Sequence, residues 1–549
     1  MAKSRHAVAI ASLFFLVFFL FGNTVTHHFN SDDYIVLYNA LLHSAGTPVS
    51  TLEEFLTPSW GLYYRPIAKI FLESLVGMFG LRPAGYHLIS LICYAVLCFE
   101  VYYIGLLLTH KWLWALASAI IFLAASAHAE ALFWISGLNG VLENILSLAS
   151  LLFFIRWRQV HSLRSYLCSL AFFAFALLTK ESSVSLPIII CSYDLLLGGE
   201  LRWPIAVKRV ARSCLPFVVL GISFMVVRHA VMRQVHLPLA LTAFDWKILV
   251  VGLWYLLIMT LSPIDWALSL HWFDKLAASH TAFPLLGGIA ILAVAIVPVL
   301  MKRFRLTFLL WWILASAAPV LALGLVPSER HAVLGSAAAA ILVSIALFKL
   351  SERLTRRSYS VVLGCAFAVI FAGTSCYFLK QRQAIWGHAS EITNGVVNQT
   401  MRLCPAPSPG TTFFFLNVPD SAEGALIFRF ETLTYALRLL YRDDSIEVVR
   451  IATIDTVPHD ALSSATAAYF RISAMGGHVY LPESGAGEQT ATEVRRRIEQ
   501  LGILREDKRY IEKWEQYGTS PLLEYYRGEL HLTGTEKLRK ILEELHSLV

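Results

Sequence analysis

The sequence predicts a polytopic α-helical membrane protein that ends in a small α/β domain. Hydrophobic residues make up 57% of the 549 residues, and several nearly uncharged runs reach the ~18 residues that indicate a transmembrane helix. Beyond about Gln381, charges become more frequent and strand-like segments alternate with helix-like ones. The net charge of +7 is modest, and Lys and Arg lie mostly in short clusters between apolar runs, so we expect topology signals and no nucleic-acid partner.

A retained anchor opens the membrane region. The run from His6 to Val25 is long enough to cross the ~30 Å hydrocarbon core as a helix. A cleaved signal peptide is the alternative, but the run is longer than a typical signal-peptide core, and residues 23–26 offer no cleavage site of small residues. Because Lys3 and Arg5 precede the run and basic residues stay in the cytosol, its far end should face the extracytoplasmic side.

Clusters of basic residues divide the apolar runs and define a topology. With the N-terminus inside, every cluster falls in the cytosol, provided that the apolar segment Lys247–Leu261 adds no single net crossing. We therefore expect that segment to be re-entrant or paired with a second short pass. About eleven spans result and leave the C-terminus outside a plasma or inner membrane. The expected spans are 6–26, 86–109, 112–127, 138–155, 165–179, 183–197, 213–232, 281–301, 306–324, 333–349 and 359–379.

Two regions outside the spans are substantial. The first extracytoplasmic loop, residues 27–85, contains an apolar stretch from Ile67 to Phe79 that is typical of a helix lying on the membrane surface. The second region follows a membrane domain of residues 1–380 and forms an extracytoplasmic α/β domain of residues 381–549. Its expected strands are 411–418, 445–451, 468–473 and 478–481, and its expected helices are 425–441, 492–501 and 535–548.

The eight cysteines show no spacing typical of a metal site. Six lie in apolar runs, where cysteine behaves as a small hydrophobic residue. Cys376 and Cys404 remain as a candidate disulfide on the oxidising side.

Two adjacent carboxylates, Asp32 and Asp33, follow the first span within a few residues. That span should deliver them to the extracytoplasmic membrane surface, where they could act on a lipid-borne substrate. The alternative is a solvated loop in which an acid caps a helix. The sequence leaves both interpretations open.

Further motifs follow the acid pair in order and on the same predicted side. They are Tyr64-Arg65-Pro66, His87, His128-x-Glu130 with Trp134-Ile135, Lys180-Glu181 and Pro327-x-Glu329-Arg330. This order, over residues 1–380, resembles the membrane-embedded GT-C glycosyltransferases. The resemblance is greatest to the protein O-mannosyltransferase-like branch, including transmembrane O-mannosyltransferases with tetratricopeptide repeats, and to bacterial relatives that move a sugar from a polyprenyl phosphate.

The resemblance implies a membrane glycosyltransferase that moves a sugar, with inversion, from a polyprenyl-phosphate donor to an acceptor hydroxyl on the extracytoplasmic face. Two departures leave the acceptor open among a glycan, a lipid and a protein. The Gly-Arg-x-Asp that often follows the Trp-Ile segment is here Gly137-Leu138-Asn139-Gly140, and the C-terminal domain has no tetratricopeptide pattern. Membrane lipid is a further expected partner.

Such a transfer needs a base for the acceptor hydroxyl and cations for the departing phosphate. Asp32 is the candidate base, and Asp33 would orient it or bind a divalent cation, which is the one cofactor left open. Several cations are predicted near the extracytoplasmic surface, against the positive-inside bias, and the planar fork of arginine suits phosphate oxygens. They are Arg65, Lys180, Arg228, Arg233 and Arg330.

Each cation also has a structural interpretation. An interfacial anchor or an ion pair would explain a charge at the membrane surface without any ligand. The neighbouring acids make two pairs plausible, Lys180 with Glu181 and Arg330 with Glu329.

His128 and Glu130 are candidates for acceptor or metal binding, and loop capping is the alternative because two residues at i, i+2 lack a third ligand. Glu100, Glu143 and Asp194 lie within or near apolar spans, where acids are costly. They could be structural hydrogen-bonding groups or a proton relay in a transporter or flippase for a lipid-linked sugar. Carriers usually show paired repeats and broken helices, and the sequence shows neither. A noncatalytic glycan-assembly subunit is the third possible function.

Overall fold

The computed structural model describes residues 2–43, 55–60, 63–199, 203–234, 246–265, 282–322, 328–429, 431–453, 478–481, 520–526, 528–534, 536–537 and 539. The chain forms two compact units. The membrane unit consists of Met1–Thr26 and Val49–Ala384, and the sheet unit consists of His27–Pro48 and Ile385–Val549. The first part of the expected loop 27–85, with Asp32 and Asp33, therefore belongs with the sheet unit.

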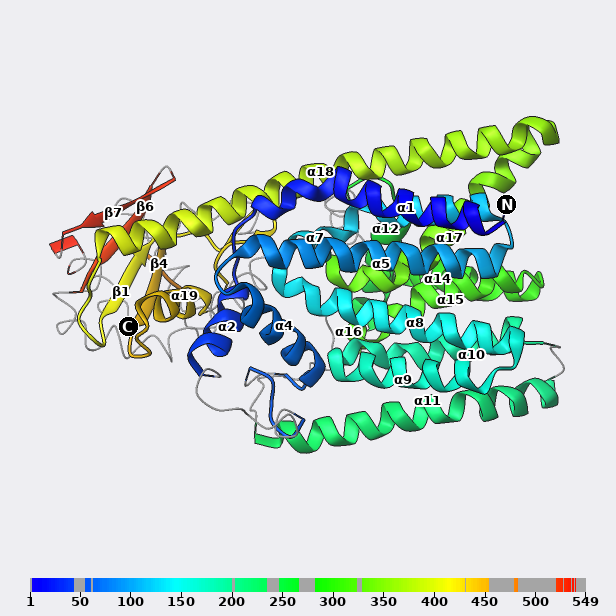
Figure 1. The fold of residues 1–549 in the computed structure, drawn as a ribbon, viewed down its shortest axis with the longest axis horizontal. Helices are drawn as coiled ribbons and strands as arrows, with labels where there is room; N and C mark the ends of the chain where they lie inside the picture. The colour runs from blue at the N-terminus through cyan, green and yellow to red at the C-terminus, as the bar shows by residue number, and fades with distance from the viewer. Residues whose placement is uncertain are drawn as a thin grey trace. The chain divides into compact units, whose positions relative to one another are not determined.

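The membrane unit is a bundle of apolar helices that run side by side (Figure 1). A helix lies at each of the eleven expected spans, and a further helix covers the segment near 247–261. The helices are α1 (Ala2–Phe21), α4 (Pro66–Phe79), α5 (Pro83–Thr109), α6 (Trp112–Leu123), α7 (Ala129–Phe133), α8 (Leu138–Val160), α9 (Leu163–Thr179), α10 (Leu186–Leu197), α11 (Trp203–Val231), α12 (Trp246–Leu261), α14 (Ala282–Leu300), α15 (Phe304–Ser316), α16 (Ala318–Leu321), α17 (Glu329–Leu354) and α18 (Arg357–Leu403), which continues into the sheet unit.

Length and composition identify a multi-pass membrane protein. Among the described residues, seven helices are long and apolar enough to cross a membrane, or eight if one bent pair forms a single span. Three further apolar helices are shorter, at Leu163–Thr179, Leu249–Leu261 and Leu286–Leu300. The helix α17 is central because its small residues from Ala337 to Ala340 are almost fully buried and allow α6 and α15 to approach it closely.

A broken helix lies in the bundle, although the sequence shows none. The helix α6 and the segment Ser126–Phe133 form a pair bent by 58°. The Tyr94 hydroxyl lies 3.3 Å and 3.0 Å from the carbonyl oxygens of Phe122 and Leu123, where α6 ends. A buried hydroxyl thus binds backbone carbonyls at the break, and the Phe122 carbonyl also accepts a hydrogen bond from the Ala125 amide at 3.1 Å.

Ion pairs join helix ends that the sequence assigns to the cytosol. Arg158 near the end of α8 lies 2.9 Å from Asp194 on α10, and Arg209 on α11 lies 3.5 Å from the same carboxylate. Lys111, before α6, pairs with Glu352 near the end of α17 at 3.1 Å. These contacts give Asp194 a structural role in holding α8, α10 and α11 together.

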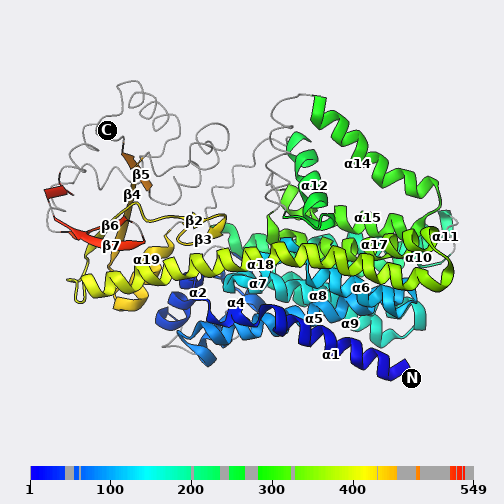
Figure 2. The ribbon, with the colours of Figure 1, turned by 90° about the horizontal axis from the view of Figure 1, so that it is seen from above.

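The sheet unit contains a five-stranded sheet in the order β5-β4-β1-β6-β7. Figure 2 shows β4 and β5 together with the hairpin of β6 and β7. Its strands are β1 (Thr412–Leu416), β4 (Glu447–Thr453), β5 (His478–Leu481), β6 (Leu522–Tyr526) and β7 (Glu529–Thr533). All neighbouring strands are parallel except β6 and β7, which form an antiparallel hairpin. The five residues of β1 are all buried, as expected for a central strand covered on both faces.

The other elements described in the sheet unit include a short hairpin and the helices α2 and α19. Strands β2 (Ser421–Ala422) and β3 (Ala425–Leu426) form the hairpin, and α19 (Thr432–Tyr441) packs against α2 (Asp33–Tyr38), which Asn39–His43 extends. The expected helix 425–441 is therefore wrong in its first part, where β3 lies. The expected strand 468–473 and helix 492–501 lie outside the described residues, as does most of 535–548.

The expected disulfide between Cys376 and Cys404 is wrong, because all eight cysteines are free. Cys376 lies on α18 and Cys404 follows its last residue. Several turns of α18 separate the two residues along the chain.

Candidate functional site

Arg65 lies at the start of α4, where Pro66 occupies the first helical position and fixes the local backbone. Its guanidinium makes a two-pronged contact with Glu181, with Nε donating to Oε2 at 2.8 Å and Nη2 donating to Oε1 at 2.5 Å. The same group lies 4.1 Å from the ring centroid of Tyr63. The fork of Arg65 is therefore already filled by a carboxylate.

Lys180 follows the last residue of α9 in an extended conformation and is buried, with 7% of its surface exposed. A Cβ at Gly140 would lie 3.3 Å from its Nζ, so the missing side chain there leaves room for the ammonium. One helical turn further along α8, Glu143 accepts hydrogen bonds from Ser183 at 2.8 Å and from Ser147 at 3.4 Å. Glu143 thus belongs to the surroundings of Lys180 and not to a chain of acids.

The charges around Lys180 act on one another. Burial lowers the pKa of Lys180 to about 8, and the positive charges of Arg65 and Arg330 act in the same direction, against Glu143. Burial alone would raise the pKa of Glu181, but the paired Arg65 and the other nearby groups outweigh it and lower the pKa to about 2. The structure therefore brings Arg65, Lys180 and Arg330 into one electrostatic cluster, which we call the cation cluster.

The N-terminus of α17 carries the third cation of this cluster. Ser328 caps the helix, and His331 takes the place of the Glu or Gln that usually completes a capping box. Glu130 Oε2 accepts hydrogen bonds from Ser328 Oγ at 3.4 Å and from the Arg330 amide at 3.3 Å, and lies 3.9 Å from Arg330 Nε. This looser contact leaves the guanidinium of Arg330, which is 36% exposed, able to turn toward a ligand.

Both ion pairs expected from neighbouring residues are wrong. Glu181 pairs with Arg65 instead of Lys180, and Glu329 pairs with Arg382 on α18 at 2.8 Å instead of with Arg330. Neighbours in an α-helix or a turn point in different directions, so partners come from other elements.

Arg382 was missed by the sequence analysis. Both Arg382 and Glu329 are nearly fully buried, and Glu329 also accepts a hydrogen bond from the Glu130 amide at 3.1 Å. One signal in the sequence could have indicated Arg382. It is a charged residue just beyond the last expected span, and a charge near the membrane is costly unless it has a partner.

His128 is fully buried, and its Nδ1 lies 2.7 Å from the Tyr94 hydroxyl at the helix break. Glu130 points to the N-terminus of α17, so the two residues form no shared site. Over the described residues, no group of three or more His, Cys, Asp or Glu side chains could hold a metal ion.

The acid pair lies in a tight turn of the sheet unit. Asp33 is 2% exposed, and its Oδ2 accepts a hydrogen bond from the Asn30 amide at 2.9 Å, so this carboxylate closes the turn that begins α2. Asp32 is half-buried, and its Oδ1 lies 3.3 Å from Ser31 Oγ. The two acids therefore differ, because Asp33 is built into the backbone turn and Asp32 is accessible.

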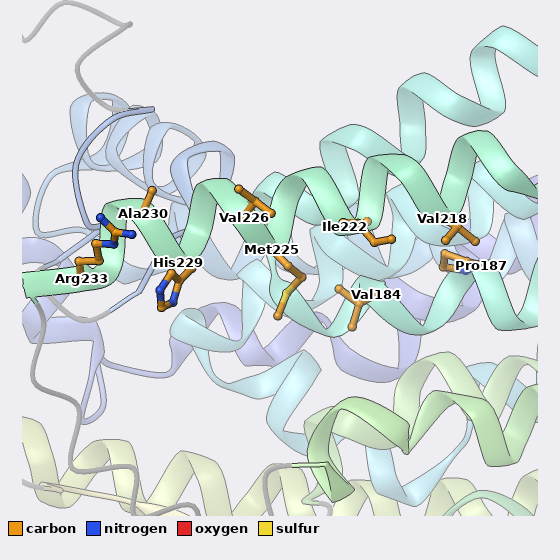
Figure 3. A pocket seen from close by; sticks show the side chains of 10 residues that line it. Val184, Pro187, Val218, Ile222, Met225, Val226, His229, Ala230 and Arg233 are labelled. Carbon is orange, nitrogen blue, oxygen red and sulfur yellow. The ribbon is translucent and has the colours of Figure 1, made fainter.

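An apolar groove of about 580 Å³ lies along α11 and the start of α10 (Figure 3). Its walls are Val184, Pro187, Val218, Gly221, Ile222, Met225, Val226, His229, Ala230 and Arg233. Arg233 and His229 are exposed at one end of the row along α11, whereas Arg228 is half-buried. Val184 and Pro187 come from the segment that follows Lys180 and Glu181 along the chain.

No protein-family model and no curated protein sequence matches this chain. The chain is similar to the crystal structure of ArnT from Cupriavidus metallidurans bound to undecaprenyl phosphate, with a TM-score of 0.47, 12% identity, and coverage of 84% of this chain and 88% of that chain. It is also similar to the archaeal oligosaccharyltransferase AglB from Archaeoglobus fulgidus in complex with an inhibitory peptide and a dolichol-phosphate, with a TM-score of 0.43, 12% identity, and coverage of 80% and 64%. At these TM-scores neither structure assigns a role to a residue of this chain.

Proposed function

We propose that the protein is a membrane glycosyltransferase that moves a sugar from a polyprenyl-phosphate donor to an acceptor hydroxyl. The observation that carries the proposal is the convergence of Arg65, Lys180 and Arg330 in the membrane unit, with Lys180 buried among them. Carboxylates compensate these charges unevenly, because Glu181 pairs closely with Arg65 whereas Glu130 contacts Arg330 only loosely at 3.9 Å. A ligand of opposite charge would therefore stabilise Lys180 and Arg330. A phosphate at the membrane surface is such a ligand.

The reaction can be written with these groups. The acceptor oxygen attacks the anomeric carbon, the bond from that carbon to the phosphate oxygen breaks, and the hydroxyl proton passes to the base, for which the sequence predicts Asp32. Lys180 and Arg330 would stabilise the negative charge on the released polyprenyl phosphate. Arg65 would hold Glu181 and contribute its charge, because its fork is occupied. A single displacement of this kind inverts the sugar.

The groove along α11 would take the donor's isoprenoid chain. The lining of the groove is mostly apolar, and the polar side chains of Arg233 and His229 lie at one end of it. An apolar isoprenoid chain matches this lining better than a sugar does. The acceptor remains a glycan, a lipid or a protein, and the reaction would take place on the extracytoplasmic face.

The test is turnover of purified protein in vesicles with a panel of polyprenyl-phosphate-linked hexoses, pentoses and amino sugars. Asp32→Asn should lower kcat by about 10²–10⁴-fold without changing the binding of undecaprenyl phosphate. Asp33→Asn should instead lower thermal stability, since its carboxylate closes the turn. Near wild-type turnover of Asp32→Asn would remove the base from this proposal.

The same vesicles distinguish the other functions that the sequence leaves open. A flippase would move the lipid-linked sugar across the bilayer without releasing free polyprenyl phosphate. A noncatalytic subunit would do neither. Glu143 and Asp194 contact different local partners, so the contacts of these acids supply no support for a proton relay.

A further inference from the structure

The turn that carries the acid pair is held from a distant part of the chain. Ser31 has a φ of 44°, in the left-handed region that a non-glycine residue rarely adopts. Its amide donates a hydrogen bond of 2.9 Å to the carbonyl of Ile427 in the sheet unit. Asn30 and Asp33 close the turn on its other side through two hydrogen bonds. The direction of Asp32, between Ser31 and Asp33, therefore depends on where the Ile427 carbonyl lies.

One buried arginine fixes the segment that contains Ile427. Arg450 is 3% exposed and lies on β4, between β1 and β5. Its Nη1 donates to the Phe428 carbonyl at 2.8 Å, and its Nη2 donates to the Val418 carbonyl at 2.9 Å. Arg450 thus ties the two ends of the segment that forms the β2–β3 hairpin to the centre of the sheet.

An acidic partner completes this arrangement. Asp420 Oδ1 lies 2.7 Å from Arg450 Nη2. The backbone carbonyl of Asp420 accepts a hydrogen bond from the Ile427 amide at 2.8 Å. Both backbone groups of Ile427 are therefore hydrogen-bonded, the amide to Asp420 and the carbonyl to Ser31.

The helix after the acid pair rests on the same surface. The ring of Tyr34 stacks on Phe428, with centroids 6.5 Å apart. Tyr38 donates a hydrogen bond to Asp444 at 3.0 Å and packs edge-on against Tyr435 of α19. The sheet unit therefore contacts α2 as well as the turn that precedes it.

We infer that Arg450 is a positioning residue for the acid pair, and that the sheet unit serves to hold Asp32 in its reactive orientation. The inference rests on the proposed function, because it takes Asp32 as the base. Arg450 acts through the Phe428 and Ile427 backbone on Ser31, and through Ser31 on Asp32. A C-terminal domain with this role is part of the catalytic apparatus.

The test uses the full-length protein in vesicles and compares Arg450→Lys with Asp32→Asn and with the double variant. Lysine keeps the charge but cannot hold the two carbonyls and Asp420 together. We expect kcat to fall by about 10-fold or more, because a small displacement of a reacting group lowers the rate strongly. The donor KM and the binding of undecaprenyl phosphate should stay unchanged. In the Asp32→Asn background, Arg450→Lys should cause little additional loss.

Phe413→Leu provides the matched control. Phe413 is fully buried in the same sheet, packs against Tyr441 and makes none of the hydrogen bonds by which Arg450 holds the Phe428 and Val418 carbonyls. The Phe413→Leu variant should lower the melting temperature about as much as Arg450→Lys does, while its kcat per folded molecule changes less than 2-fold. If Arg450→Lys fails to fold, Asp420→Asn replaces it in the test, because this change leaves the two carbonyl contacts of Arg450 in place. Asp420→Asn should lower kcat by a smaller factor, with unchanged donor KM and little additional loss in the Asp32→Asn background.

Two results overturn the inference. Unchanged kcat in folded Arg450→Lys and Asp420→Asn, or losses that multiply with that of Asp32→Asn, would show that Arg450 only stabilises the sheet. Full activity of Asp32→Asn would instead overturn the proposed base itself, and the inference with it. The Asp32→Asn measurement thus separates the two failures.

Discussion

Lys180 shows how surroundings change a single side chain. An ordinary lysine keeps its charge far above neutral pH, whereas burial and two arginines lower the pKa of Lys180 to about 8. Because its folded pKa lies below its unfolded value, protonated Lys180 costs the fold stability below about pH 8, and the cost disappears as pH rises toward the unfolded pKa. A bound phosphate would remove that cost by compensating the charge.

We therefore expect a pH-dependent affinity for undecaprenyl phosphate. Binding should weaken as pH rises through about 8, because Lys180 loses its proton in the free protein. Lys180→Arg should remove this decline, since an arginine stays charged. Equilibrium binding in vesicles between pH 6.5 and 9.5 measures the effect. A decline of equal size in Lys180→Arg would assign it to another group.

The two arginines of the cation cluster should respond differently to the same substitution. Arg65→Lys breaks the two-pronged contact with Glu181, so its main effect should be a lower melting temperature. Arg330→Lys disturbs a loose 3.9 Å contact but loses the fork offered to phosphate, so its main effect should be on donor KM and kcat. For Arg330→Ala, loss of a preorganised cation should lower kcat by about 10²–10³-fold. Unchanged kinetics in both Arg330 variants would remove this residue from the site.

At the scale of elements, the start of α17 collects the charged groups. Its capping serine, its first backbone amides and the pair of Glu329 with Arg382 connect α7, α17 and α18. The helix N-terminus adds partial positive charge to the cation cluster. The segment that follows Lys180 connects this cluster to the groove between α10 and α11.

Filling the groove should impair donors with long chains. A Cβ at Gly221 would meet no atom within 4 Å, so Gly221→Leu places a side chain in the groove without straining the fold. We expect the KM for a long polyprenyl-phosphate donor to rise several-fold, while a short-chain donor is affected less. Gly373→Leu on α18 is the control, because that glycine also has open space around it. Equal effects of the two variants would show that the chain binds elsewhere.

At the scale of the whole molecule, the sidedness of the basic clusters predicts where each unit faces. The end of η1 (Gly22–Thr26) and the sheet unit should both be extracytoplasmic. In a background without reactive native cysteines, Thr26→Cys and Ser421→Cys, both at exposed positions, should react with an impermeant thiol reagent in intact cells. Arg353→Cys, also exposed, should react only after permeabilisation. Labelling of one of the first two sites alone would contradict an odd number of crossings.

The sequence by itself determined the properties that accumulate over many neighbouring residues. Hydrophobicity summed over about 20 residues placed a helix at every expected span, and charge asymmetry predicted one side for Arg65, Lys180 and Arg330. Strand-like segments located β1 within one or two residues of its ends and β5 at its bounds. The predictions of helices and strands succeed because each depends on local composition alone, whereas the predicted side of the membrane stays a prediction.

The tertiary structure decided which groups meet. Glu181 binds Arg65, Glu329 binds Arg382, and the acid pair belongs with a sheet whose strands lie some 400 residues away in the chain. The hairpin of β6 and β7 and the free state of Cys376 and Cys404 were likewise beyond the sequence. A contact of this kind depends on how helices and strands pack, and short motifs contain no information on the direction in which each side chain then points.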